Sequence, residues 1–166
     1  MTDEADLVYS NYIEANHSLT PQTASILVKG FCRIKQVDKA VEFWKQLDKF
    51  NIVVDDTFYN NLLNGCAKNG CNDTALEVVA DALTSKAKLH TSTLNAVMDS
   101  CVGSGRLDLG WDLLNIIKSS DVIPDNLTFC ILAKGVKTVH HKDTLMRLFQ
   151  VLLNSLTQEP DCSKLY

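Results

Sequence analysis

The sequence has few residues that break helices and no long apolar segment. Only three prolines occur in 166 residues. We place Pro21 and Pro124 between helices and Pro160 after the last one, because a proline inside a helix removes a backbone hydrogen bond. The strict alternation of apolar and polar residues that marks a half-buried strand is absent. No stretch of about 18 apolar residues occurs, so we expect an all-α protein with no membrane partner.

The motifs of common active sites and metal sites are also missing. Six cysteines occur, but none forms a Cys-x-x-Cys pair, so we expect reduced, intracellular thiols rather than disulfide bonds or zinc ligands. His140 and His141 are adjacent in a predicted turn with no third ligand nearby in the sequence, which argues against a metal site. We find no nucleophile with its base and no phosphate-binding glycine loop. The sequence therefore predicts no enzyme activity, no cofactor and no metal.

An excess of positive charge is lacking too. The formal net charge is −4, whereas a basic domain is the usual mark of a nucleic-acid binder. The distribution of charge matters more than its sum, because a basic groove can lie on an acidic protein. The acidic segment Thr2–Asp6 argues against a transit peptide within this chain.

What the sequence does contain is a repeat. Aspartates recur every 35 residues, at Asp3, Asp38, Asp73, Asp108 and Asp143. Small residues recur in the same phase, at Gly30, Gly65, Ser100 and Gly135. A fixed period of this size indicates a stacked array of structural repeats.

Each period contains two apolar stretches with the i, i+3, i+4, i+7 spacing of one helix face. The first stretch, which we name helix A, starts its apolar face at Ala24, Tyr59, Leu94 and Phe129. The second, helix B, starts its apolar face at Ala40, Ala75, Gly110 and Leu145. The sequence thus predicts one helical hairpin in each period.

The residues between helices A and B suggest how each turn is built. The aspartates stand just before helix B, where we expect them to be N-caps that also favour the helix dipole. Gly70 and Gly105 are expected to end helix A. Lys35 and His140 replace glycine in the other two repeats, so we expect those turns to close differently.

The text of the repeat resembles that of a known family. Residues 55–70 read DDTFYNNLLNGCAKNG, residues 124–135 read PDNLTFCILAKG, and residues 37–47 read VDKAVEFWKQL. These segments resemble the pentatricopeptide repeat, whose text typically runs P-D-x-x-T-Y-N-x-L-I-x-G-x-x-K-x-G. The 35-residue period separates it from the tetratricopeptide repeat, which has 34 residues.

The resemblance implies an all-α fold, a right-handed superhelical α-solenoid of 35-residue helix-turn-helix repeats. It places repeats at 21–55, 56–90, 91–125 and 126–160, the last of them degenerate, followed by a frayed tail at 161–166. Residues 1–20 match helix B alone. We therefore expect either a fragment that begins with a half repeat or an adapted N-terminal cap.

For function, the resemblance implies binding of single-stranded RNA, with one base met by each repeat along the helix A groove. In this family the fifth and last residues of a repeat read the base, which implies the pairs Ser25 with Asp55, Asn60 with His90, and Asn95 with Asp125. Asn95 with Asp125 matches the combination associated with uridine, and Ser25 with Asp55 is similar to the one that prefers guanine. Asn60 with His90 departs from the usual combinations.

Other positions carry over in the same way. The fourth base-reading residue is Cys130, whose partner Pro160 cannot read a base as the others do. The residues that would sandwich bases are the second of each repeat, Gln22, Thr57, Ser92 and Leu127, of which only Leu127 is aliphatic as is usual in the family. The residues that would contact phosphate are Arg33 and Lys68.

Two other functions remain open from the sequence. Helical repeats also present extended concave surfaces to protein partners, so a protein-interaction solenoid is the main alternative. The chain could also be an accessory part of a larger RNA-processing protein, with further repeats outside it. By family resemblance we expect a role in RNA processing or organelle gene expression, in mitochondria or another organelle.

Overall fold

The computed structural model describes residues 20–47, 53–120 and 122–138. Within these ranges the chain forms α-helices and no strand. The helices are α2 (Pro21–Arg33), α3 (Val37–Leu47), α4 (Asp56–Asn69), α5 (Asn72–Thr84), α6 (Thr91–Gly103), α7 (Leu107–Lys118) and α8 (Asn126–Thr138). The predictions for residues 1–19 and 139–166, which include the half repeat, the His140 turn, Pro160 and the tail, lie outside the described residues.

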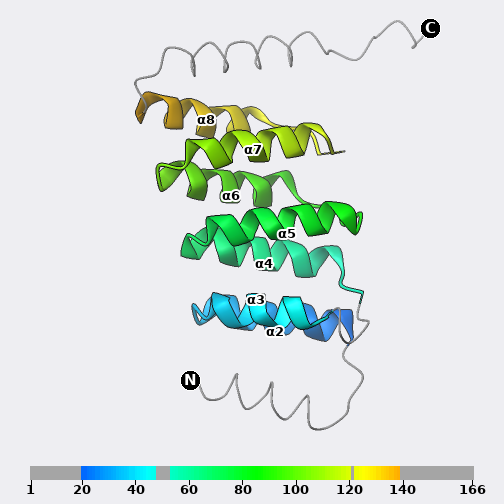
Figure 1. The fold of residues 1–166 in the computed structure, drawn as a ribbon. Coiled ribbons are helices and arrows are strands. Elements are labelled where there is room, and N and C mark those ends of the chain that lie inside the picture. Colours follow the sequence, from blue (N-terminus) through cyan, green and yellow to red (C-terminus); the bar gives the residue numbers. More distant parts are fainter. Residues whose placement is uncertain (1–19, 48–52, 121, 139–166) are drawn as a thin grey trace, which may run out of the picture.

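The helices stack in sequence order into an elongated array (Figure 1). Helices α2, α4, α6 and α8 are the A helices, and each packs extensively on the next A helix along the chain. Helices α3, α5 and α7 are the B helices, and each packs on the A helix that precedes it. The prediction of an all-α solenoid is confirmed, because every helix contacts only its near neighbours in the array.

The hydrophobic core lies between the A helices and the B helices. It contains the apolar positions that the spacing predicts, including Val28, Leu63 and Met98 on the A helices, which are fully buried. On the B helices, Ala40, Val79 and Leu114 are equally buried. A continuous core of this kind is what stacking of amphipathic hairpins provides.

The cysteines of this core are structural. Cys66 and Cys101 occupy the same position one repeat apart, and both are fully inaccessible to solvent. Burial raises the pKa of Cys66 to about 12 and that of Cys32 to about 11. These thiols therefore stay protonated at neutral pH and pack as small hydrophobic side chains.

Small residues set the distance between successive A helices. A Cβ atom added to Gly65 would overlap Cys32 Sγ, and one added to Gly135 would lie 2.7 Å from side-chain atoms of Val102 and Leu107. Ser100 stands at the equivalent position in α6, where its hydroxyl donates to Asn72 Oδ1 over 2.8 Å. Gly65 and Gly135 thus mark close approaches between successive A helices, whereas Gly30 has no atom within 4 Å of its Cβ position among the described residues.

The turn from helix A to helix B has the same geometry in all three described hairpins. Gly70 and Gly105 adopt left-handed backbone conformations, with φ of 73° and 80°. Lys35 does so as well, with φ of 62°, and the amides of Lys35 and Gln36 donate to the carbonyls of Cys32 and Phe31 as their counterparts do. The expectation that the Lys35 turn closes differently is wrong. The hydrogen bonds at the end of the helix hold a non-glycine residue in the glycine conformation.

The aspartates that recur every 35 residues do not cap helix B. Asp38, Asp73 and Asp108 are each the second residue of their helix. Cys71 and Arg106 occupy the N-cap positions of α5 and α7 and make no side-chain capping bond. The predicted capping hydrogen bond is therefore wrong, whereas the favourable position of the charge in the first turn stands.

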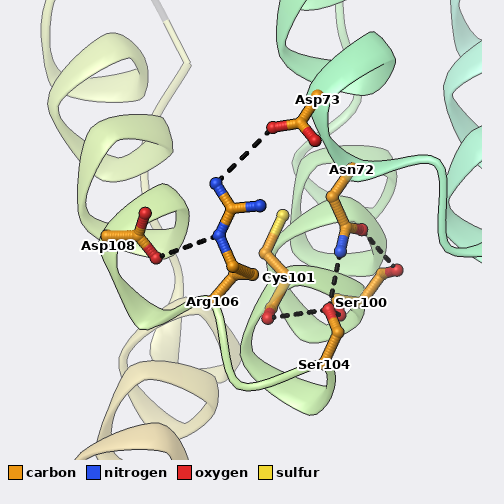
Figure 2. A network of polar contacts seen from close by, with 7 residues as sticks. All are labelled: Asn72, Asp73, Ser100, Cys101, Ser104, Arg106 and Asp108. Carbon is orange, nitrogen blue, oxygen red and sulfur yellow. Dashed lines mark hydrogen bonds and ion pairs between the residues drawn. The ribbon is translucent and has the colours of Figure 1, made fainter.

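Figure 2 shows the contacts that two of these aspartates, Asp73 and Asp108, make between α5 and α7. The Arg106 guanidinium lies 3.5 Å from a carboxylate oxygen of Asp73 and 3.5 Å from one of Asp108. All three side chains are well exposed, so these ion pairs contribute little to stability. Beneath them, buried Asn72 donates to Ser104 Oγ over 2.6 Å and accepts from Ser100 Oγ.

Candidate nucleic-acid interface

The predicted base-sandwiching and base-reading residues lie at the N-terminal ends of the A helices. The second residues of the predicted repeats, Gln22, Thr57, Ser92 and Leu127, are all exposed. The fifth residues Ser25, Asn60 and Asn95 are buried, with at most 6% of their surface exposed, whereas Cys130 is exposed. Since a buried polar group needs partners, the hydrogen bonds of the fifth residues decide what they can offer a ligand.

Ser25 and Asp55 form a direct pair. Ser25 Oγ donates to Asp55 Oδ1 over 2.7 Å. The same oxygen accepts the backbone N–H of Phe58 over 2.8 Å, so Asp55 is the N-cap of α4. With its proton donated, the Ser25 hydroxyl retains only acceptor capacity. Two residues that are 30 positions apart thus meet at the junction between α2 and α4.

Asn95 and Asp125 meet in the same way between α6 and α8. Asn95 Nδ2 donates to Asp125 Oδ1 over 2.9 Å, and Asn95 Oδ1 accepts from the Thr128 hydroxyl over 2.7 Å. Asp125 Oδ1 also accepts the Thr128 backbone N–H over 2.9 Å. The backbone hydrogen bond from Thr128 and the side-chain bond from Asn95 lower the pKa of Asp125, so it remains a carboxylate at neutral pH.

This arrangement leaves two polar groups for a ligand. Within residues 20–47, 53–120 and 122–138, the second N–H of Asn95 donates to no partner. Asp125 Oδ2 accepts no side-chain hydrogen bond there, although the backbone N–H of Leu127 lies near the carboxylate. One is a hydrogen-bond donor and the other an acceptor. A uracil edge presents a carbonyl oxygen beside an N–H group, so a donor beside an acceptor is complementary to it.

Asn60 and His90 are related differently. Asn60 Nδ2 donates to two backbone carbonyls, of Asp56 over 2.7 Å and of Lys88 over 3.0 Å. Asn60 Oδ1 accepts the backbone N–H of His90 over 3.0 Å. The residues are adjacent as predicted, but the contact involves the backbone of His90 and not its imidazole.

A small pocket lies between α6 and α8 beside the Asn95 pair. Its volume is about 390 Å³, and its walls include four of the predicted site residues, Ser92, Asn95, Leu127 and Cys130. Leu127 is 55% exposed at this pocket. Lys134 Nζ and Asp99 Oδ1, 3.1 Å apart, form an ion pair at the pocket that the sequence analysis did not identify. An apolar side chain beside a polar edge suits a flat heterocycle.

A second cleft, of about 550 Å³, lies between the C-terminal halves of α2 and α4. It brings together the two predicted phosphate ligands, Arg33 and Lys68, and adds two further cations, Lys29 and Lys35. No acidic residue lines it, and in the described part of the chain none of these cations forms an ion pair. Lys29 lies one helical turn before Arg33, a spacing that could have identified it from the sequence.

No cluster of histidine, cysteine and acidic side chains suited to a metal ion occurs within the described ranges. No helix there is long and apolar enough to cross a membrane.

The fold and the surface of the A helices define a class, the α-solenoids built from helical hairpins. The family model of the PPR repeat matches residues 23–52, 57–83 and 92–122, just over half of the chain. The chain belongs to the pentatricopeptide repeat family.

Relatives and solved structures agree with this membership. The chain is 29% identical over 94 residues to the mitochondrial pentatricopeptide repeat-containing protein At1g53600 of Arabidopsis thaliana, covering 57% of this chain and 13% of that protein. It is 22% identical over 165 residues to At1g56690, also named as mitochondrial, covering 94% of this chain and 21% of that protein. The chain therefore spans only a small part of the length of these relatives.

Among solved structures, the PPR domain of Arabidopsis thaliana protein-only RNase P 1, in complex with tRNA, matches with a TM-score of 0.71 at 13% identity. It covers 95% of this chain and 83% of that one. The maize protein PPR10 matches with a TM-score of 0.63 at 21% identity, over 90% of this chain and 21% of that one. PPR10 in complex with an 18-nt psaJ RNA element gives a TM-score of 0.58 at 12% identity, over 90% of this chain and 22% of that one. At such identities the matches establish the fold.

Proposed function

We propose that this chain binds single-stranded RNA along its A helices. The observation that carries the proposal is the uncompensated cationic cleft of Lys29, Arg33, Lys35 and Lys68, which shares the A helices with a pocket lined by Asn95 and Leu127. Phosphate contacts supply much of the affinity for nucleic acid, and contacts to base edges supply specificity. The solved structures of PPR10 with an RNA element and of the RNase P domain with tRNA, which share this fold, support RNA binding by analogy.

In this proposal one base meets each repeat, with repeats at 21–55, 56–90, 91–125 and 126–160. Asn95 and Asp125 hold a uracil through the free N–H and carboxylate oxygen, with Leu127 and Ser92 on the two sides of the base. Ser25 with Asp55 offers acceptors only, which suits the N–H groups on the edge of guanine. Arg33 and Lys68 neutralise phosphates together with Lys29 and Lys35.

The proposed role is binding, within RNA processing or organelle gene expression. The names of the two curated relatives support a mitochondrial setting. Because the chain spans a small part of those relatives, further repeats would add base contacts to the ones described here.

The test is a fluorescence anisotropy titration of the chain into a labelled random pool of short single-stranded RNA, with the same RNA made double-stranded as competitor. We expect saturable binding that unlabelled single-stranded RNA displaces and double-stranded RNA does not. Equal displacement by both competitors, or no saturable change in anisotropy, would contradict the proposal.

A second candidate function is contact with a protein. A large cleft of about 1310 Å³ lies at the C-terminal ends of α5 and α7, where Leu83, Ile116, Val122 and Ile123 contribute apolar walls. Ile123 is 80% exposed, and apolar patches of this kind can mark protein interaction sites. Substituting Ile123 with Asp would abolish the binding of such a partner and leave RNA binding unchanged.

A further inference from the structure

The second predicted repeat differs from its neighbours in how its fifth residue is bonded. Asn60 and Asn95 are the same residue type at the same position, 35 residues apart. Asn95 donates to the side chain of the last residue of its repeat, Asp125. Asn60 faces His90 at that place, and its amide turns to the backbone instead.

The hydrogen-bonding capacity of Asn60 is almost completely occupied within the protein. A carboxamide has two N–H donors, and those of Asn60 are taken by the carbonyls of Asp56 and Lys88. Its oxygen accepts from the His90 amide. Asn60 therefore has no donor left for a base, whereas Asn95 has one.

The same bonds fasten the segment between α5 and α6. Lys88 donates its backbone N–H to Asp56 Oδ1 over 2.8 Å, while its carbonyl accepts from Asn60. With the bond from His90, three hydrogen bonds join the first turns of α4 to this segment. Because Asn60 anchors the backbone, rotating it toward a ligand would break its two bonds to this segment, with Lys88 and His90.

The last residue of the repeat explains the difference. Asp55 and Asp125 each accept a backbone N–H at the start of the next A helix and also accept from the fifth residue. His90 occupies the corresponding N-cap of α6 and makes no side-chain capping bond. Because no carboxylate is present there to accept its N–H groups, Asn60 donates to backbone carbonyls instead.

We infer that the second repeat does not discriminate between bases, and that Asn60 is a structural residue rather than a base reader. The inference rests on the proposed function and sharpens it: a bound RNA has two discriminated positions, which face Ser25 with Asp55 and Asn95 with Asp125, on either side of one that accepts any base. The position between them contributes through its phosphate and through non-specific packing.

The test begins with the sequences that the chain selects from a random single-stranded RNA pool. Each position of the best sequence is then replaced by the other three bases, and the dissociation constants are compared. We expect losses of about fivefold or more at the two outer positions and less than about twofold at the middle one. Discrimination at three consecutive positions would overturn the inference and leave the proposed function intact, whereas failure to bind any RNA would overturn the proposed function.

Matched variants distinguish a structural role for Asn60 from a role in reading the base. Asn60→Ala should lower the midpoint of thermal unfolding and leave the relative preference among bases unchanged. Asn95→Ala should reduce the preference at its own position. His90→Asp supplies the missing carboxylate, and we expect it to create discrimination at the middle position. If Asn60→Ala alters base preference, or His90→Asp creates none in a folded protein, the inference is wrong.

Discussion

Removal of charge from the cleft between α2 and α4 gives the sharpest test of how RNA is held. The perturbation is the double substitution of Arg33 and Lys68 with Gln, which removes two of the four cations that line the cleft. Both side chains are exposed, and neither forms an ion pair within the described ranges. The substitution should therefore leave the stability of the fold nearly unchanged.

The magnitude follows from counterion release. Each cation that neutralises a phosphate of a single strand contributes about 0.7 to the slope of log affinity against log salt concentration. Loss of two such cations should reduce the slope by about 1.4, which over a fourfold range of salt changes the affinity ratio about sevenfold. The preference among bases should not change, because phosphate contacts carry no direct sequence information.

The assay is fluorescence anisotropy at several salt concentrations, with Lys118→Gln as the matched control. Lys118 is an exposed cation at the end of α7, away from the cleft. The control removes one charge rather than two, so a reduction of the slope half as large as that of the double variant would show that only the overall charge matters. An unchanged slope in the double variant would refute the assignment of Arg33 and Lys68 to phosphate.

Three further predictions concern stability, measured by chemical denaturation. Gly65→Ala should destabilise the fold by about 1–3 kcal/mol because the new Cβ would overlap Cys32 Sγ. The control is Gly30→Ala, which should be neutral or stabilising because no described atom lies within 4 Å of the Cβ position there. Lys35→Gly should stabilise by about 1 kcal/mol, since glycine adopts positive φ without strain; a loss of stability would contradict this. Hydrogen bonds lower the pKa of Asp125. Its contribution to the free energy of unfolding should therefore be fully present above the pKa of the unfolded chain, about 3.9, and be lost as the pH falls through the pKa of the folded state. Asp125→Asn should remove this dependence of stability on acid pH.

The architecture could be predicted from the sequence because it depends on periodicity. Burial on one face of a helix imposes a spacing that survives substitution, so Leu63 and Met98 could be assigned to the core without a structure. The small residues at the same phase helped to reveal the repeat, but the sequence could not show that Gly65 packs against Cys32 or that Ser100 bonds to Asn72.

Two errors of the sequence reading arise where backbone geometry outweighs residue preference. Lys35 is an unusual residue for a left-handed turn, yet the helix-end hydrogen bonds impose that conformation on it. Asp73 and Asp108 lie two residues past the N-caps of α5 and α7, inside the first turn, and therefore do not cap these helices. Helix ends are uncertain by one or two residues in any sequence reading, which is enough to change a cap into a first-turn residue.

The candidate site could be predicted only in part. The resemblance placed Ser25 near Asp55 and Asn95 near Asp125, and the structure brings these pairs together. It could not reveal that Asn60 bonds to the carbonyl of Lys88, because the direction of a carbonyl in a loop is not encoded in any local pattern. The cationic cleft also needed the structure, since it combines residues from neighbouring helices.

The most direct test of the central claim is to map the RNA contact on the chain by the NMR shifts of its backbone amides on addition of its selected single-stranded RNA. Binding along the A helices predicts shifts concentrated around Arg33, Lys68, Asn95 and Asp125, with the exposed faces of α3, α5 and α7 unaffected. Shifts concentrated instead at the cleft around Ile116 and Ile123, with none at Arg33 or Asn95, would contradict the account.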